Sequence, residues 1–296
     1  EGRIETDENG FELRFNSPEI KFQDYFANKI NITLNNNNPL FNTFIEIDSV
    51  NAGFYKASKF SLISVTKRDT LFIKSEFSGG ENNKDDYNLN LFYTIDKSNK
   101  SVVGFKRSDL RFKNYEWFIN SEKDTLNKIR FDRDFKTFDI FPISLDNEDE
   151  EILLSGNIKD SINKNLKLDF KDVQLQKITP RIDSLDLKGS VNGNLDLIQN
   201  NGVYLPKSDV VISSLFVNDY DLGNLSAKIE GDNSITNYIV DVSLVNDNLK
   251  SLLINGTIDI DQSDPRIDLD VAFDEFLLDP LNPLGEGVIS NIRGLV

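Results

Sequence analysis

Apolar and polar residues alternate along most of this chain, most clearly between Leu185 and Phe273. In residues 185–197, for example, Leu, Val and Gly occupy one parity, whereas Asp, Lys, Ser and Asn occupy the other. Successive side chains of a β-strand point to opposite faces of a sheet, so this pattern predicts strands with one apolar and one solvated face. Further strands of this kind are predicted at residues 225–231, 240–244, 254–260 and 267–273.

The apolar positions of these strands are predicted to share one face of a sheet. They are Leu185, Leu187, Val191, Leu195, Leu197, Leu225, Ile229, Val240, Val242, Leu244, Ile254, Ile258, Ile260, Ile267, Leu269, Val271 and Phe273. Four glycines, Gly156, Gly189, Gly193 and Gly256, are predicted to kink the strands, because a missing side chain lets a sheet curve. For Gly189 and Gly193, bulges in an ordinary sandwich strand are the alternative interpretation.

The N-terminal half shows the same alternation. Ser17-Pro18 predicts either the start of a short helix that ends near Phe26 or, almost equally, a short strand. The segment ENNKDD at residues 81–86 predicts an exposed turn. Strands are predicted around residues 11–15, 30–34, 44–48, 60–65, 71–77, 87–95, 101–105, 110–119 and 131–143.

One break in composition suggests a boundary. Residues 146–151 (DNEDEE) carry five carboxylates, and they lack the alternating Asp spacing and Gly of an EF-hand, so a solvated turn is the favoured interpretation. Eighteen of the 22 Phe residues lie at or before Phe141. We therefore predict an aromatic-rich N-terminal β segment over residues 1–150 and glycine-kinked β repeats over residues 151–296.

Composition restricts the possible chemistry. The chain has neither His nor Cys, so it offers no imidazole base, no thiolate and no His or Cys metal ligand. No catalytic residue, metal site or cofactor is predicted. With 33 basic and 49 acidic residues the net charge is −16, which disfavours nucleic acid and anionic membrane surfaces as partners. No apolar run is long enough for a transmembrane helix, so we expect any membrane anchor to lie outside this segment.

The chain also repeats itself. Residues 153–158 (LLSGNI) match residues 253–258 (LINGTI) at an offset of 100 residues. In each copy an alternating strand follows the glycine, and a proline (Pro180 or Pro280) lies 24 residues after it. The second copy reaches RGLV where the sequence stops, which predicts that the chain ends inside a repeat and that more repeats follow. Repeated β units that bury a face against their neighbours build quasi-one-dimensional structures.

Three segments carry a family resemblance. Residues 168–180 (LDFKDVQLQKITP), 187–195 (LKGSVNGNL) and 284–295 (LGEGVISNIRGL) resemble the repeats of TamB proteins, relatives of the AsmA-like family of Gram-negative envelopes. The resemblance covers residues 150–296. It implies an all-β, elongated, curled sheet that forms a taco-like groove with an apolar interior.

The resemblance also implies a function. Such a groove spans the periplasm, where it carries phospholipid between the inner and outer membranes or supports outer-membrane protein assembly. The apolar positions given above would then line the lipid path, with phospholipid acyl chains as partners. An Omp85-class outer-membrane barrel is a further expected partner, through regions outside this segment. The resemblance also implies a membrane anchor outside this segment.

Two other interpretations fit the alternation. A closed β-sandwich or a solenoid with a structural or adhesive role has the same period of two. A parallel β-helix with an Asp cluster could act on polysaccharide, but no carboxylate interrupts the apolar parity of the C-terminal strands, where a catalytic cleft would show. We therefore expect a protein that is not an enzyme.

Overall fold

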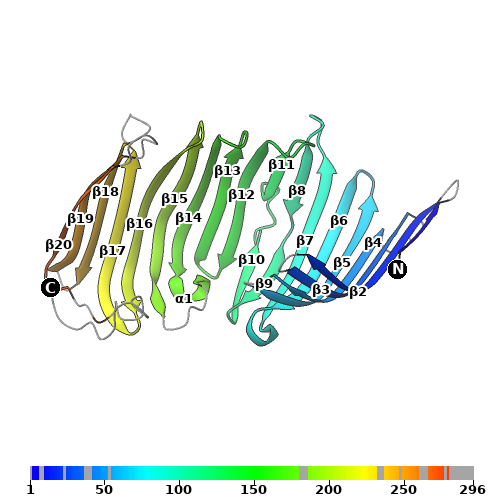
Figure 1. Cartoon of the computed structure of the whole chain (residues 1–296), viewed down its shortest axis with the longest axis horizontal. Helices are drawn as coiled ribbons and strands as arrows, with labels where there is room; N and C mark the ends of the chain where they lie inside the picture. Colours follow the sequence, from blue (N-terminus) through cyan, green and yellow to red (C-terminus); the bar gives the residue numbers. More distant parts are fainter. Residues whose placement is uncertain are drawn as a thin grey trace. The chain divides into compact units, whose positions relative to one another are not determined.

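The computed structural model describes residues 2–6, 10–22, 25–36, 42–52, 55–179, 186–231, 237–246, 249–259, 266–276 and 279. These residues form twenty β-strands and two short helical turns, so the protein is all-β, as predicted (Figure 1). The chain divides into two compact units, Glu1–Asn147 and Glu148–Val296, and the division lies inside the acidic segment 146–151.

The first unit contains twelve strands and one 3-10 turn, η1 (Glu81–Asn83). The strands are β1 (Gly2–Thr6), β2 (Phe11–Phe22), β3 (Tyr25–Asn35), β4 (Thr43–Asn51), β5 (Lys56–Lys67), β6 (Thr70–Gly79), β7 (Asp85–Ile95), β8 (Ser101–Phe105), β9 (Ser108–Phe112), β10 (Tyr115–Ile119), β11 (Lys128–Phe131) and β12 (Phe138–Asn147).

The sheet of the first unit opens after β7. Strands β1 to β7 pair antiparallel in chain order. One part of β7 then pairs with β8 and another part with β9. Strand β8 continues to β11, strand β9 continues to β10, and both branches end on β12. The two branches therefore frame an opening in the sheet between β7 and β12.

The second unit is a simple antiparallel meander. Its strands β13 to β20 lie side by side in chain order, and each strand pairs with the next (Figure 1). They are β13 (Glu150–Ile158), β14 (Lys164–Gln174), β15 (Leu187–Asn200), β16 (Val203–Val217), β17 (Tyr220–Gly231), β18 (Asn237–Asn246), β19 (Leu249–Asp259) and β20 (Arg266–Phe273), with helix α1 (Leu175–Ile178) between β14 and β15.

Most strand predictions agree with these elements, but two predicted single strands are wrong and two alternative interpretations are excluded. Ser17-Pro18 lies inside β2, so the alternative of a strand holds and the short helix does not form. The predicted single strands 110–119 and 131–143 are each interrupted by a turn, which gives β9 with β10 and β11 with β12. A parallel β-helix is also wrong for the described strands, because all their pairs are antiparallel.

Two acidic turns predicted to be solvated contain a buried carboxylate each. Asp85, at the end of ENNKDD, is 7% exposed, and its Oδ1 accepts a hydrogen bond from the Lys113 backbone N–H at 3.1 Å. Glu150, in DNEDEE, is 8% exposed, and its Oε1 lies 2.7 Å from Lys177 Nζ. Each carboxylate is buried against the segment that it contacts. Glu150 of β13 thereby connects this strand to α1.

The two copies of the repeat each form a strand that pairs with the strand after it. Leu153–Ile158 lies in β13 and Leu253–Ile258 lies in β19, and each strand pairs antiparallel with the strand that follows it. Asn255-Gly256 lies in the middle of β19, so it forms no hairpin turn. Both prolines of the repeat, Pro180 and Pro280, fall outside the described residues.

Candidate functional site

The register of the second unit aligns apolar residues across its strands. Residues directly opposite each other in an antiparallel pair place their side chains on the same face. One row takes one residue from each of the eight strands: Ile152, Phe170, Gly193, Val210, Ala227, Val242, Ile254 and Val271. At roughly 4.8 Å between strands, this row is about 34 Å wide.

Rows on either side of it have the same character. One contains Leu154, Leu168, Leu195, Ser208, Ile229, Val240, Gly256 and Leu269. The other contains Val173, Val191, Ile212, Leu225, Leu244, Leu252 and Phe273. We call the surface formed by these three rows the apolar face.

The remaining predicted positions extend or adjoin the apolar face. Leu197 pairs with Leu166, Ile258 pairs with Ile267, and these pairs follow the row of Leu195 by two residues on their strands. Leu187 pairs with Val217 beyond a register shift in β15 and β16. Leu185 and Ile260 lie outside the described residues. The structure thus brings every described apolar residue that the sequence marks into one set of neighbouring strands, and lipid binding by them stays a prediction.

One end of the apolar face is covered. Helix α1 contributes Leu175 and the segment after β20 contributes Phe276, which pack with Leu215 and Leu244 in a buried cluster. Partly buried neighbours of this cluster are Ile212, Val217, Leu222, Leu225 and Leu252. The cluster supplies a conventional hydrophobic core for that end of the unit.

Parts of the apolar face away from α1 are open to solvent, on β13, β15 and β20. Leu195 and Leu197 are each 44% exposed, and Ile267 is 73% exposed. Leu154 and Val271 are also exposed. These residues lie in two groups, on β13 with β15 and on β20, because Ser208 and Val240 in the row that joins them are buried. Exposed apolar residues that gather on neighbouring strands are candidates for contact with a ligand, a membrane or a partner.

The other face of the same strands is polar. A row directly beside the central apolar row consists of Asp169, Asn194, Asp209, Lys228, Asp241, Asn255 and Asp270. Ion pairs such as Lys167–Asp169 and Lys228–Glu230 add to this charged surface. The sheet of this unit therefore has one apolar face and one polar face.

The four marked glycines adopt backbone conformations that other residues avoid. Gly156, Gly189, Gly193 and Gly256 have φ values of 141°, 141°, 118° and 155°. A Cβ atom at Gly156, Gly193 or Gly256 would lie 2.0 to 2.1 Å from a carbonyl oxygen of the adjacent strand. The neighbouring backbone thus occupies the space of a side chain, and these positions require glycine.

Bulges occur beside the glycines. The register shifts between Phe170 and Val173 opposite Gly193, and between Lys188 and Ser190 at Gly189. Pairing continues without a shift through Gly156 and Gly256. Gly189 therefore lies at a bulge and Gly193 lies opposite the end of another, as the bulge interpretation predicts, whereas Gly156 and Gly256 lie in continuous pairing.

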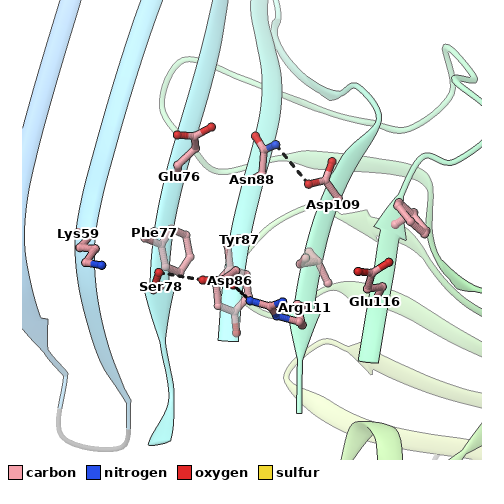
Figure 2. A pocket seen from close by; sticks show the side chains of 12 residues that line it. Lys59, Glu76, Phe77, Ser78, Asp86, Tyr87, Asn88, Asp109, Arg111 and Glu116 are labelled. Carbon is pink, nitrogen blue, oxygen red and sulfur yellow. Dashed lines mark hydrogen bonds and ion pairs between the residues drawn. The ribbon is translucent and has the colours of Figure 1, made fainter. Parts of the chain in front are cut away.

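The first unit carries a polar pocket on β5, β6, β7, β9 and β10 (Figure 2). Its volume is about 540 Å³, and Glu76, Asp86, Asp109 and Glu116 line it together with Lys59 and Arg111. The registers explain this grouping, because Glu76 lies opposite Asn88, which lies opposite Asp109, and Asp86 lies opposite Arg111. The sequence does not reveal this cluster, since β7 and β9 are not consecutive strands.

Most carboxylates of this pocket already have partners. Asp86 accepts hydrogen bonds from Ser78 Oγ at 2.9 Å and from Arg111 (Figure 2). Asp109 accepts one from Asn88 Nδ2 at 3.2 Å. Glu76 Oε1 lies 2.6 Å from Lys74 Nζ. Three of the four carboxylates in the pocket are therefore hydrogen-bonded or ion-paired.

A tyrosine pair lies beside this pocket. The Tyr55 hydroxyl lies 3.0 Å from the Tyr87 hydroxyl and 3.1 Å from Asp85 Oδ2. Burial and the hydrogen bond with Tyr87 raise the pKa of Tyr55, and burial also raises the pKa of Tyr87. Both hydroxyls therefore stay protonated at neutral pH, which suits a structural role better than that of a base or nucleophile.

Within the described residues, no group of three or more acidic side chains is arranged to hold a metal ion. Across the same part of the chain, no helix has the length and apolar character needed to cross a bilayer. Comparison of the chain with known protein families, with curated proteins and with solved structures finds no match.

Proposed function

We propose that the apolar face of the second unit binds phospholipid acyl chains, and that the chain belongs to a TamB-like carrier of the Gram-negative periplasm. In this role it would pass phospholipid between the membranes or support outer-membrane protein assembly. The observation that supports the proposal is the set of aligned apolar rows across eight strands, which are exposed on β13, β15 and β20 away from α1.

The energetics favour an aliphatic guest. Each methylene removed from water contributes about 0.8 kcal/mol, so ten methylenes laid along the rows would contribute about 8 kcal/mol before ordering costs. The polar row on the opposite face keeps the sheet solvated while the guest lies on the apolar rows. Lipid head groups need no dedicated pocket in this arrangement, because they can remain in water.

Several features support a curled, taco-like sheet within this unit. Register shifts occur in the pairs β14–β15, β15–β16, β16–β17 and β18–β19. Bulges and glycines of this kind bend strands and increase sheet coiling. A curled sheet with its apolar face inward would shelter acyl chains from water.

We also propose a binding role in preference to a catalytic one. In the polar pocket of the first unit, neighbouring side chains already hold three of the four carboxylates. A stable structural module with a dry, filled interior is the competing function, and the experiment below separates the two.

Site-specific photocrosslinking in the envelope of a Gram-negative host tests the proposal. A benzophenone amino acid would replace Leu195, Ile254 or Val271 on the apolar face, and Asn194, Asn255 or Asp270 on the polar face as matched controls. We expect phospholipid adducts, identified by mass spectrometry, at the first set alone. Equal labelling of both faces, or no lipid at either, would refute lipid binding by the apolar face.

A further inference from the structure

The opening in the sheet of the first unit contains a second cavity. Its volume is about 490 Å³, and its walls come from β7 and from the two connections that cross the opening, β8 to β9 and β10 to β11. Strand β7 supplies Asn90 and Phe92, and the first connection supplies Lys106 and Arg107. Cavities of about 300 to 1,000 Å³ are the size of small-molecule sites.

The second connection is a rigid wall. Asn120 is 2% exposed, its Nδ2 donates to the carbonyl oxygens of Phe105 and Asp124 at 2.7 and 2.8 Å, and its Oδ1 accepts from the Asp124 N–H at 2.6 Å. Asn120 and Lys123 have positive φ values, 54° and 59°. Asn tolerates this conformation in turns, so it is the hydrogen bonds of Asn120 that hold this connection in place.

A buried hydroxyl fixes the point where β7 divides its pairing between β8 and β9, which we call the fork. Ser108 is fully buried, and its Oγ accepts a hydrogen bond from the Asn90 N–H at 2.8 Å. The Asn90 side chain donates to the Arg107 carbonyl oxygen at 3.1 Å, and the Lys106 N–H donates to the Asn90 carbonyl oxygen at 2.8 Å. These bonds hold the two basic residues at the rim of the cavity.

Aromatic rings position the same two cations. Lys106 Nζ lies 4.2 Å from the centre of the Phe72 ring, and Arg107 Cζ lies 4.7 Å from the centre of the Phe118 ring. Phe92 provides an apolar wall, and Gly104 leaves room for it, because a Cβ at Gly104 would lie 2.0 Å from the Phe92 ring. Neither the Phe72 nor the Phe118 ring lines the cavity, so these contacts hold the two cations beside an apolar cavity that Phe92 and Phe105 line.

The positive charge at this cavity is not neutralised. Lys106, Arg107 and Lys123 line it, and none of them has an ion pair among the described residues. The single carboxylate in the lining, Asp124, accepts a hydrogen bond from the Leu126 N–H at 2.9 Å. Three cations against one carboxylate leave two positive charges here, in a chain whose net charge is −16.

We propose that this cavity binds a small organic anion that has a flat apolar body and one carboxylate, sulfonate or phosphate group. The apolar body would lie against Phe92 and Phe105, and the anionic group would meet Lys106, Arg107 and Lys123 at the rim. This site lies in the first unit and does not depend on lipid binding by the apolar face.

The test uses two fluorescent probes that differ in charge. The probes are 8-anilinonaphthalene-1-sulfonate, an aromatic anion, and its uncharged relative N-phenyl-1-naphthylamine. The variants are Lys106→Gln/Arg107→Gln, Lys123→Gln, and the control Lys128→Gln. Lys128 lies over the Phe141 ring at 5.0 Å without lining the cavity, so it matches the geometry of Lys106.

We expect the double variant to raise the dissociation constant of the anionic probe about tenfold, equivalent to about 1.4 kcal/mol, and Lys123→Gln to raise it about threefold. The control variant and the binding of the uncharged probe should remain unchanged, and unaltered thermal midpoints would show that the variants are folded. The proposal is overturned if the control loses as much affinity, if both probes weaken together, or if no variant has an effect.

Discussion

Gly193→Ala in β15 tests whether close strand approach dictates glycine on the apolar face. Gly193 has a φ of 118°, and an added Cβ would lie 2.0 Å from the Asp209 carbonyl oxygen of β16 and 3.0 Å from Val210 Cα. Both atoms belong to backbone, so no side-chain rotation can relieve the contact. Strands β15 and β16 would have to separate locally.

The expected cost follows from three contributions. An L-residue held at positive φ costs about 1 to 2 kcal/mol, and separating the strands loses hydrogen bonds worth about 1 kcal/mol each. Replacing glycine also restricts the unfolded chain, which returns about 0.4 to 1 kcal/mol. We expect the free energy of unfolding to fall by about 3 kcal/mol, given two weakened hydrogen bonds.

Gly202→Ala is the matched control, because Gly202 lies in the turn between the same two strands. Its φ is 86°, yet the nearest atom to an added Cβ is Ile162 Cγ2 at 3.7 Å. This variant carries the conformational cost without the collision, so we expect a loss of about 1 kcal/mol.

Urea unfolding followed by circular dichroism measures both variants through their midpoints and slopes. The difference of about 2 kcal/mol between them isolates the contact with β16. If Gly193→Ala is no less stable than Gly202→Ala, the strands can accommodate a side chain at Gly193, and close approach is not the reason for glycine there.

Three further predictions concern single side chains. Leu195→Asp should fold normally, because Leu195 is 44% exposed, but it should recover much less phospholipid in native mass spectrometry; undiminished recovery would remove Leu195 from the lipid path. Glu150→Gln should lower the free energy of unfolding in urea by about 3 kcal/mol, because Lys177 then keeps a buried charge without this partner; a loss under about 1 kcal/mol would contradict this. Hydrogen bonds from the Asn163 side chain and nearby backbone N–H groups lower the pKa of Asp160, so its ionised form stabilises the folded state. Asp160→Asn should therefore have a lower thermal midpoint at neutral pH, and the difference from wild type should vanish as the pH falls below the folded-state pKa; a difference that persists in acid would exclude this origin.

The sequence predicted the apolar face well because a period of two is an almost direct consequence of strand geometry. Ile254, Gly256 and Ile258 share a face of β19 whatever strand lies beside them. Alternation does not fix which residue of one strand lies opposite which residue of the next. The alignment of Ile254 with Val242 and Val271 therefore had to come from the structure.

Turns without Gly or Pro were the main source of error. Strands β9 and β10 are joined at Lys113 and Asn114, which have φ values of 53° and 70°. Two consecutive residues at positive φ are typical of the tight turn of a hairpin, and Asn tolerates this conformation. Asn114 was thus the one local signal of a turn, but it lies in an otherwise strand-like run of apolar and charged residues.

The buried charges and the cavities depend on long-range pairing. Glu150 appeared to be part of a solvated acidic run, because nothing nearby in sequence shows that Lys177 returns to it. The cation-lined cavity exists only because β7 pairs with both β8 and β9, so Asn90 meets Arg107 across the fork. Local patterns contain no information about such a fork.

The chain-order pairing of β13 to β20 has a consequence for how such a unit can evolve and form. Since each strand depends on its immediate predecessor and successor, duplication of one hairpin would widen the unit by about 9.6 Å without rearranging the rest. The same locality allows the strands to be added one after another as the chain folds. The width of such a sheet can therefore change during evolution by the duplication of single hairpins.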